Sequence, residues 1–176
     1  LEESTMTTCI FRRSRAWEPA ALEMARVAWR RHGAPPEEWF ELLRPAPHVL
    51  WGWSEFHRLT FDEGLLPVHL KALAMALLAA RLGHRRWTAG LVGRGGPAGL
   101  TVADVAATEA GDLERFDPKT RAALTYVGRL EGNYLTVDDR FMADVAGALS
   151  PGELVEIGMF AGLHLGSIRL ARLAAA

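Results

Sequence analysis

Residues 66–101 read LPVHLKALAMALLAARLGHRRWTAGLVGRGGPAGLT, and this stretch decides the fold. In its first half the leucines recur at helical spacing, and alanines make much of the remaining surface small and apolar. A helix that is apolar on nearly all sides belongs in a protein core. Gly83 then breaks the helix, a second short helix follows, and Gly and Pro residues make a turn. We therefore expect a central helical hairpin around residues 66–101.

The rest of the chain predicts further helices and no sustained strand. Several segments begin with a residue suited to capping a helix, among them Thr101, Asp117 and Ser150. The helices predicted outside the hairpin are residues 17–31, 35–44, 48–61, 101–111, 117–130, 136–149 and 150–173. No alternation of apolar and polar residues persists for more than about five residues. The fold class predicted is all-α: a multi-helical bundle of seven to nine helices.

Finer expectations follow from the same patterns. Within 48–61, one helical face carries Val49, Leu50, Trp53, Phe56 and Leu59, and we expect this face to pack on the central helix. Thr136 is the predicted N-cap of the segment 136–149. The helix 150–173 is predicted to be the longest after the central one. Residues 1–16 are predicted to form a loose tail, and residues 17–176 a single domain.

Composition narrows the classes of partner. The chain has 176 residues, with 20 basic against 21 acidic side chains, so its charge offers no attraction for nucleic acid or an anionic membrane surface. A hydrophobic fraction of 49% with six tryptophans indicates apolar surface covered by a sister subunit, as in a homo-oligomer. The single Cys9 closes no intramolecular disulfide, and the apolar run Ala72–Ala80 is too short for a membrane span. We expect a cytoplasmic protein whose partners are small organic molecules or its own copies.

His84 is the residue we single out for chemistry. It follows the helix break at Gly83 and precedes Arg85, Arg86 and Trp87. The neighbouring positive charges favour a neutral imidazole that acts as a base, whereas the alternative is an imidazolium at the helix C-terminus that offsets the helix dipole. His84 is therefore the candidate catalytic residue.

The neighbours of His84 are the candidate substrate-binding residues. Arg85 and Arg86 suit a carboxylate, which a guanidinium binds through two hydrogen bonds, although a solvated helix face is the alternative. Trp87 lines an apolar pocket or simply packs in the core. The six histidines match no metal-binding spacing, and the segment GRGGPA at 93–98 follows a helix rather than a strand, so neither a metal nor a cofactor is predicted.

From Trp39 to Leu173 the order of several helix motifs resembles a known superfamily. The motifs are APHVLWGW at 46–53, EGLLPVHLKALAMALLAA at 63–80, AGLTVADV at 98–105, DPKTRAALTYVGRL at 117–130 and LSPGELVEIGMFAG at 149–162. Their order resembles the alkylhydroperoxidase D-like (AhpD-like) and carboxymuconolactone decarboxylase-like superfamily, especially its longer peroxidase-related members. The resemblance implies a helical fold of that kind and assembly into trimers or hexamers.

The functional residues of that superfamily are missing here. Its redox members use a glutamate, a CxxC pair and a later histidine, and these positions fall on Ala72, on His84 and Trp87, and on Leu91. Without a thiolate there is no nucleophile to attack a peroxide. Decarboxylase-type relatives use a histidine at the place of Leu91, so ordinary lactone decarboxylation is also in doubt.

Three hypotheses remain from the sequence. The first is a non-redox homo-oligomer with a small-molecule pocket near His84 and Trp87. The second is a cofactor-free decarboxylase or isomerase of a small carboxylate, with His84 as general base and Arg85 or Arg86 holding the substrate. The third is residual hydroperoxide reduction through an intermolecular pair of Cys9 residues.

Overall fold

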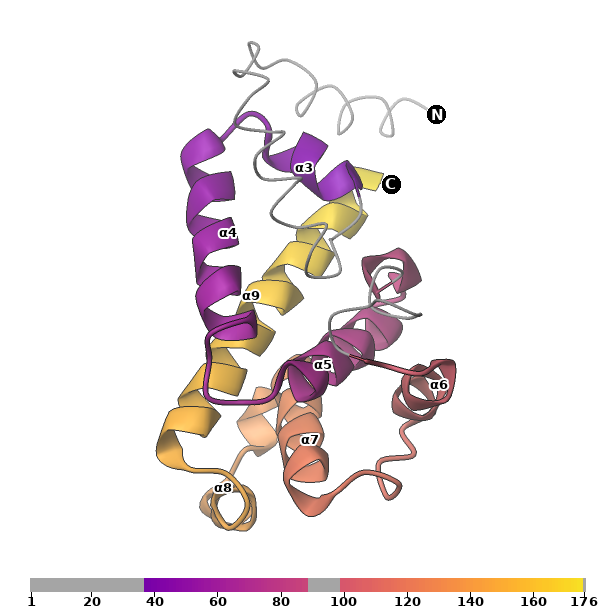
Figure 1. Cartoon of the computed structure of the whole chain (residues 1–176), viewed down its shortest axis with the longest axis vertical. Coiled ribbons are helices and arrows are strands. Elements are labelled where there is room, and N and C mark those ends of the chain that lie inside the picture. Colours follow the sequence, from indigo (N-terminus) through magenta and orange to yellow (C-terminus); the bar gives the residue numbers. More distant parts are fainter. Residues whose placement is uncertain (1–36, 89–98, 176) are drawn as a thin grey trace.

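A computed structural model of the chain describes residues 37–88 and 99–175. Within these ranges it is all-α, as predicted, with seven α-helices and two short 3-10 helices (Figure 1). The α-helices are α3 (Glu37–Leu43), α4 (Pro47–Phe61), α5 (Val68–Arg81), α6 (Val102–Ala110), α7 (Pro118–Gly132), α8 (Asp139–Ala146) and α9 (Pro151–Ala175). The 3-10 helices are η1 (Arg85–Thr88) and η2 (Tyr134–Thr136). The predicted tail 1–16, the predicted helix 17–31 and the GRGGPA segment lie outside the described residues.

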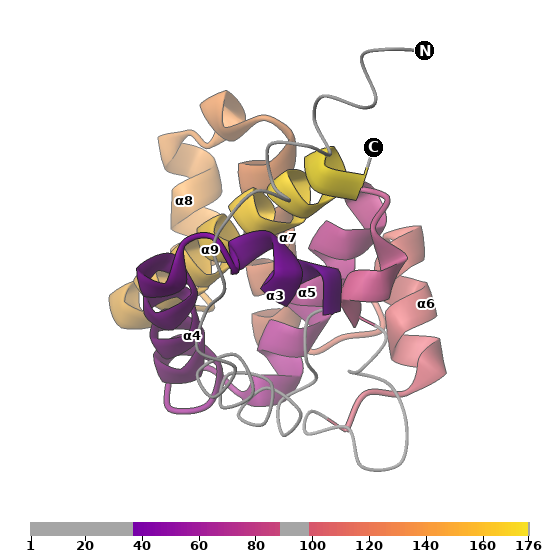
Figure 2. The same cartoon turned by 90° about the horizontal axis from the view of Figure 1, so that it is seen from above.

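Helix α5 is the centre of the bundle, in agreement with its composition. Every residue from Leu70 to Ala79 is buried, and α5 packs against α6, α7, α9 and η1 (Figures 1 and 2). Alanine on its surface lets these neighbours approach closely, while its leucines supply most of the apolar area removed from water.

Helix α5 ends in a Schellman motif built on Gly83. The backbone N–H of His84 donates to the carbonyl of Ala79 at 2.7 Å, and that of Gly83 donates to Ala80 at 3.0 Å. Gly83 has φ +67°, a left-handed conformation that glycine adopts without steric cost. The guanidinium of Arg172 on α9 caps the Leu82 carbonyl. The predicted break at Gly83 is therefore confirmed, and it turns the chain into η1.

Helix α4 buries only part of the predicted face, with Leu50 and Trp53 inside, and it packs mainly on α9 rather than on the central helix α5 as predicted. Its buried residues are Leu50, Trp53, His57 and Phe61. Val49 is 44% exposed and Leu59 is 49% exposed, so these two predicted core residues face outward. Sequence spacing defines an apolar stripe only to within about one residue around the helix, and the polar His57 shifted our prediction of that stripe.

Helix α9 is the longest helix, with 25 residues against 14 in α5, which corrects the predicted order of lengths. It runs diagonally across the bundle and contacts α3, α4, α5 and α7 (Figure 1). Its other side remains apolar but exposed, including Val155, Met159 and Leu173. Within the described ranges it is the one helix long and apolar enough to cross a membrane, with 39% of its most apolar window buried. Core helices of soluble proteins pass this criterion as well, so location stays a prediction.

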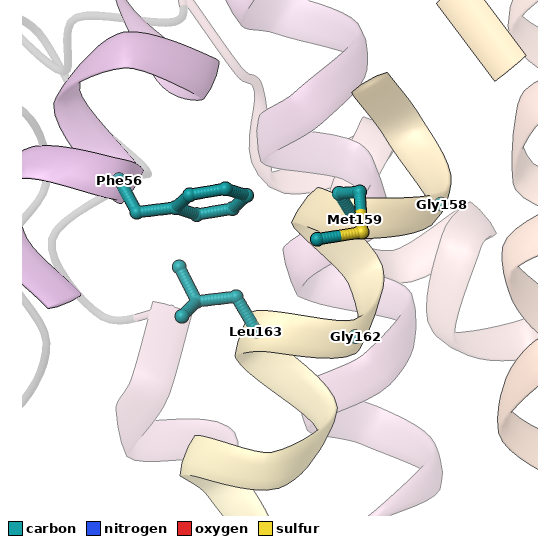
Figure 3. A pocket seen from close by; sticks show the side chains of 5 residues that line it. All are labelled: Phe56, Gly158, Met159, Gly162 and Leu163. Atoms are coloured by element: carbon teal, nitrogen blue, oxygen red, sulfur yellow. The ribbon is translucent and has the colours of Figure 1, made fainter. Parts of the chain in front are cut away.

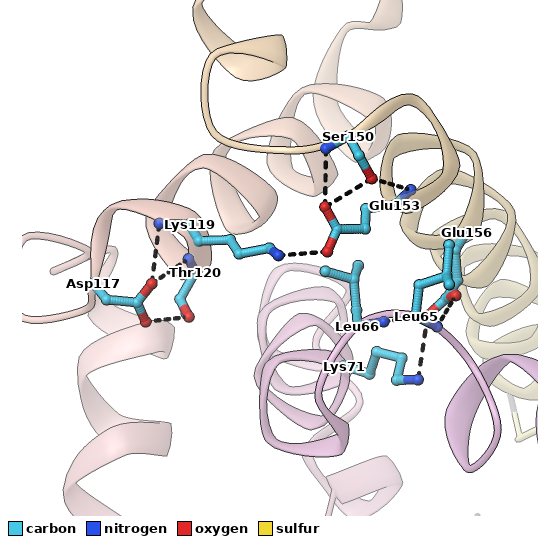
Figure 4. Close-up of polar contacts among 9 residues, drawn as sticks. All are labelled: Leu65, Leu66, Lys71, Asp117, Lys119, Thr120, Ser150, Glu153 and Glu156. Carbon is cyan, nitrogen blue, oxygen red and sulfur yellow. Dashed lines mark hydrogen bonds and ion pairs between the residues drawn. The ribbon is translucent and has the colours of Figure 1, made fainter.

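Three of the four predicted helix caps are confirmed. Thr101 forms a full capping box with Asp104, and Asp117 accepts the backbone N–H groups of Lys119 and Thr120. Ser150 and Glu153 form the third (Figure 4). Thr136 does not cap α8: it ends η2, and Asp138 accepts the N–H of Phe141 instead, at 2.8 Å. The Asp138 carboxylate is a stronger acceptor than the Thr136 hydroxyl.

One buried ion pair fastens α9 to the start of α5. The Lys71 side chain is fully buried, and its ammonium lies 3.3 Å from a carboxylate oxygen of Glu156 (Figure 4). The ammonium also donates to the carbonyl of Thr60. Glu156 also accepts the backbone N–H groups of Leu65 and Leu66. Burial lowers the pKa of Lys71 below its ordinary value, and the negative charge of Glu156 opposes that shift.

Candidate functional site

The structure separates the four residues that the sequence singles out. His84 is half-buried after the break, and its ring meets the ring of Trp87 edge-on with centroids 5.8 Å apart. The side chains of Arg85 and Arg86 are each 79% exposed, whereas Trp87 is fully buried. His84 and Trp87 therefore contact one another, while the two arginine side chains extend toward solvent.

Both arginines have acidic partners on neighbouring helices. Arg85 lies 3.4 Å from a carboxylate oxygen of Glu109 on α6, and Arg86 donates to Glu38 on α3 at 2.8 Å. The Glu38 pKa is lowered by its backbone hydrogen bond and, less strongly, by Arg86. This arrangement matches the solvated-face alternative better than a clamp for a substrate carboxylate.

Trp87 is hydrogen-bonded to one of two buried histidines, neither of which was a candidate from the sequence. The indole N–H of Trp87 donates to Nδ1 of His164 on α9 at 3.3 Å. Nε2 of His164 lies 3.0 Å from Nδ1 of His57 on α4. Both histidines are 1% exposed. The contact joins residues 107 positions apart in the chain, so only the packing of α4 on α9 creates it.

The contacts determine which nitrogen of each ring carries hydrogen. An indole N–H only donates, so Nδ1 of His164 is the acceptor and its Nε2 carries the hydrogen. That hydrogen points to His57, whose Nδ1 is therefore an acceptor and whose Nε2 carries the hydrogen of the neutral ring. The three residues form a hydrogen-bond chain with one direction, from Trp87 through His164 to His57.

Aromatic rings enclose the histidine pair. His57 is stacked between Trp53 and Phe61, with ring centroids 5.6 Å and 4.9 Å away, and Phe160 lies 4.5 Å from His164. Trp39 on α3 contacts the rings of Trp53 and Trp87. We call these seven residues the indole–imidazole cluster: Trp39, Trp53, His57, Phe61, Trp87, Phe160 and His164.

Burial keeps His164 uncharged. Desolvation lowers the pKa of His164 to about 3, because an imidazolium in this apolar surrounding would lose its hydration. His164 is therefore neutral at physiological pH and too weak a base to take a proton there. The tautomers also argue against a metal between the rings, because the facing Nε2 of His164 carries hydrogen. Within residues 37–88 and 99–175 no group of three or more metal-binding side chains occurs.

An apolar groove lies on the outer side of the same two helices. It has a volume of about 260 Å³ and is lined by Phe56, Gly158, Met159, Gly162 and Leu163. The side chains of Phe56 from α4 and of Met159 and Leu163 from α9 surround the hollow (Figure 3). Phe56 and Leu163 directly precede His57 and His164 in sequence, so the groove is lined by different residues of α4 and α9 than those that form the cluster.

The positions that correspond to the functional residues of the superfamily lie in different parts of the structure. Ala72 is fully buried in α5, and Trp87 belongs to the indole–imidazole cluster, while His84 lies at its edge. Leu91 and Cys9 lie outside the described residues. Spacing alone could have found His57, since it shares the face of Leu50, Trp53 and Phe61, but a histidine on an apolar helix face is usually a core residue with no further role.

Comparisons of the chain with models of known protein families, with curated proteins and with solved structures find no match.

Proposed function

We propose that the chain is a non-redox protein of the alkylhydroperoxidase D-like and carboxymuconolactone decarboxylase-like kind, which assembles as a homo-oligomer and binds a small organic molecule near His84 and Trp87. The observation that carries the proposal is the position of Trp87. Trp87 stands where redox members of the superfamily that this chain resembles have a reactive cysteine. Its indole N–H donates a hydrogen bond to His164, which is paired with His57 in the buried, neutral histidine pair.

The chemistry of the cluster favours binding over redox turnover. Its groups are aromatic rings, imidazoles and indole N–H groups, which recognise an apolar molecule and hydrogen-bond to it. Such pockets combine an apolar wall with a small number of oriented polar groups. His84 lies at the more exposed end of the cluster, where its ring meets that of Trp87, so it stands where a ligand would enter.

Assembly is supported by the outer side of α9. Val155, Met159 and Leu173 are 67%, 55% and 64% exposed, and they share one face of the helix. An extended apolar face on a protein of this size is typical of a surface covered by another chain. We expect trimers or hexamers, and light scattering that gives a monomer at micromolar concentration would contradict this part of the proposal.

A thermal-shift screen tests ligand binding. The panel contains small carboxylates, keto acids, lactones and hydroperoxides, and the proteins are the parent, His84→Ala and the control His48→Ala, which alters an exposed histidine on α4. A ligand at a hundred times its dissociation constant adds about 2.7 kcal/mol, or about 5 to 10 °C in melting temperature. A shift retained in His48→Ala and lost in His84→Ala supports the pocket. An absence of any shift, or equal shifts in all three proteins, contradicts it.

The second candidate is a cofactor-free decarboxylase or isomerase of a small carboxylate. His164 does not serve as its base because burial depresses its pKa to about 3, so His84 remains the candidate base. Turnover of a panel carboxylate that His84→Ala abolishes, with folding unchanged, would favour this function over binding alone.

A further inference from the structure

The indole–imidazole cluster holds more hydrogen-bond donors than acceptors. Each imidazole acceptor already has its donor: Nδ1 of His164 accepts from Trp87, and Nδ1 of His57 accepts from His164. The hydroxyl of Ser167 accepts from the indole of Trp53 at 2.8 Å and donates its own hydrogen to the Leu163 carbonyl. These contacts satisfy the indoles of Trp53 and Trp87.

The indole N–H of Trp39 donates to none of these acceptors. Its side chain is 2% exposed, and its Nε1 atom is buried without a hydrogen-bond partner in the described part of the chain. The ring lies between two other indoles, with its centroid 5.3 Å from that of Trp53 and 5.3 Å from that of Trp87. Both neighbours offer aromatic faces and N–H groups, and neither supplies a lone pair.

A buried N–H without an acceptor is rare in folded proteins and costs stability, so its retention calls for an acceptor from elsewhere. We propose that the Trp39 N–H donates to the oxygen of a bound neutral molecule, such as a ketone, an ester or a lactone. This inference rests on the proposed small-molecule function and names the class of ligand: a compact apolar body with one acceptor oxygen.

The surroundings select a neutral acceptor over a carboxylate. The rings that surround His164 belong to Trp53, His57, Trp87 and Phe160, all aromatic side chains, and burial among them lowers the pKa of His164. Arg85 and Arg86 are exposed and lie against Glu109 and Glu38, so neither guanidinium faces inward to neutralise an anion. A carboxylate placed here would lose its hydration without gaining a counter-charge.

The test uses two probes of nearly the same shape. Cyclohexanone carries a carbonyl oxygen, and methylenecyclohexane replaces that oxygen with a CH₂ group. Binding is followed through the indole N–H resonances in proton–nitrogen correlation NMR, and Trp39→Phe identifies the Trp39 resonance by its loss. Trp51→Phe serves as the matched control, since Trp51 is 65% exposed.

Cyclohexanone should move the Trp39 N–H proton resonance downfield, and methylenecyclohexane should not. Trp39→Phe should bind cyclohexanone about five- to tenfold more weakly, the value of one hydrogen bond, while Trp51→Phe should bind it as the parent does. Circular dichroism and melting of each variant verify the fold.

Three results would overturn the inference. In the first, both probes bind, the Trp39 resonance does not move and Trp39→Phe keeps its affinity; the pocket of the proposed function would then stand without this hydrogen bond. In the second, the free protein already shows a downfield Trp39 resonance with magnetisation transfer from water, which identifies a bound water as the acceptor. In the third, neither probe binds, and the thermal-shift panel then decides the proposed function separately.

Discussion

Replacing Glu156 by glutamine should destabilise the protein through the buried Lys71. In the parent, the Glu156 carboxylate lies 3.3 Å from the Lys71 ammonium and accepts the N–H groups of Leu65 and Leu66. The glutamine side chain would keep an amide oxygen for one of these donors and lose the negative charge. Lys71 would then retain the Thr60 carbonyl as a hydrogen-bond acceptor and the weaker attraction of Asp62, and would lose the stronger attraction of Glu156.

The expected loss is about 3 kcal/mol at neutral pH, the lower end of the cost of breaking a buried ion pair by removing one partner. The lower end applies because the amide still accepts one hydrogen bond. For a domain of this size the loss corresponds to a drop of about 6 to 12 °C in melting temperature.

The loss should depend on pH with a definite sign. Burial holds the pKa of Lys71 below 10.5 in the folded protein, whereas the unfolded chain has the ordinary value. Between these two pKa values the unfolded chain binds the extra proton, so stability rises with pH in that window. Without the Glu156 charge the folded pKa falls further and the window widens downward. The deficit of Glu156→Gln relative to the parent should therefore shrink as pH rises from about 7 toward 10.5.

Urea unfolding at about pH 7 and about pH 9.5 measures both effects. Glu55→Gln is the matched control, because it neutralises an acidic partner of Arg58 in an ion pair whose two side chains are 42% and 39% exposed. This control should lose less than about 1 kcal/mol. The reasoning is refuted if Glu156→Gln loses no more than Glu55→Gln, or if its deficit is the same at both pH values.

Two further changes test the helix break and the neutral histidine pair. Gly83→Ala should cost about 1 to 2 kcal/mol, because alanine is strained at φ +67°, whereas Gly52→Ala in α4, where an added Cβ meets nothing within 4 Å, should stabilise by about 0.5 to 1 kcal/mol. Urea midpoints that move in the same direction for both would contradict this. His164 has a folded pKa of about 3 against 6.5 unfolded, so the parent loses stability as pH falls through that interval, by up to about 1.4 kcal/mol per pH unit. His164→Gln accepts and donates but does not titrate, so its stability should fall less steeply with acid; an identical slope in the two proteins would show that His164 is not neutral when folded.

Local rules predicted the fold class and most helix boundaries. The composition of α5, the glycine at 83 and the caps at Thr101, Asp117 and Ser150 depend on interactions within a few residues, and each is confirmed. The predictions that were wrong concern places where two neighbouring residues were about equally suited to the same structural role. Asp138 replaced Thr136 as the cap of α8, and α4 rotated so that His57 rather than Leu59 faces inward.

The sequence predicted a site at His84 and the three residues that follow it, and of these Trp87 alone belongs to the buried indole–imidazole cluster. Spacing indicates the buried face on which His57 lies, but the hydrogen bond between His57 and His164 had no sequence signal, because the two residues are 107 positions apart and neither belongs to a motif. The assignment to a superfamily, the oligomeric state and the cellular location stay predictions.

What the sequence by itself determined is the set of helices and the burial of α5, since periodicity and capping act over a turn or two of chain. Only the tertiary structure decided that α4 and α9 meet through His57 and His164, with the indole of Trp87 beside them. The physical reason is that a helical pattern specifies which residues share a face, while the partner of that face depends on packing between segments far apart in the chain. In that packed interior two scattered histidines become one neutral, hydrogen-bonded unit.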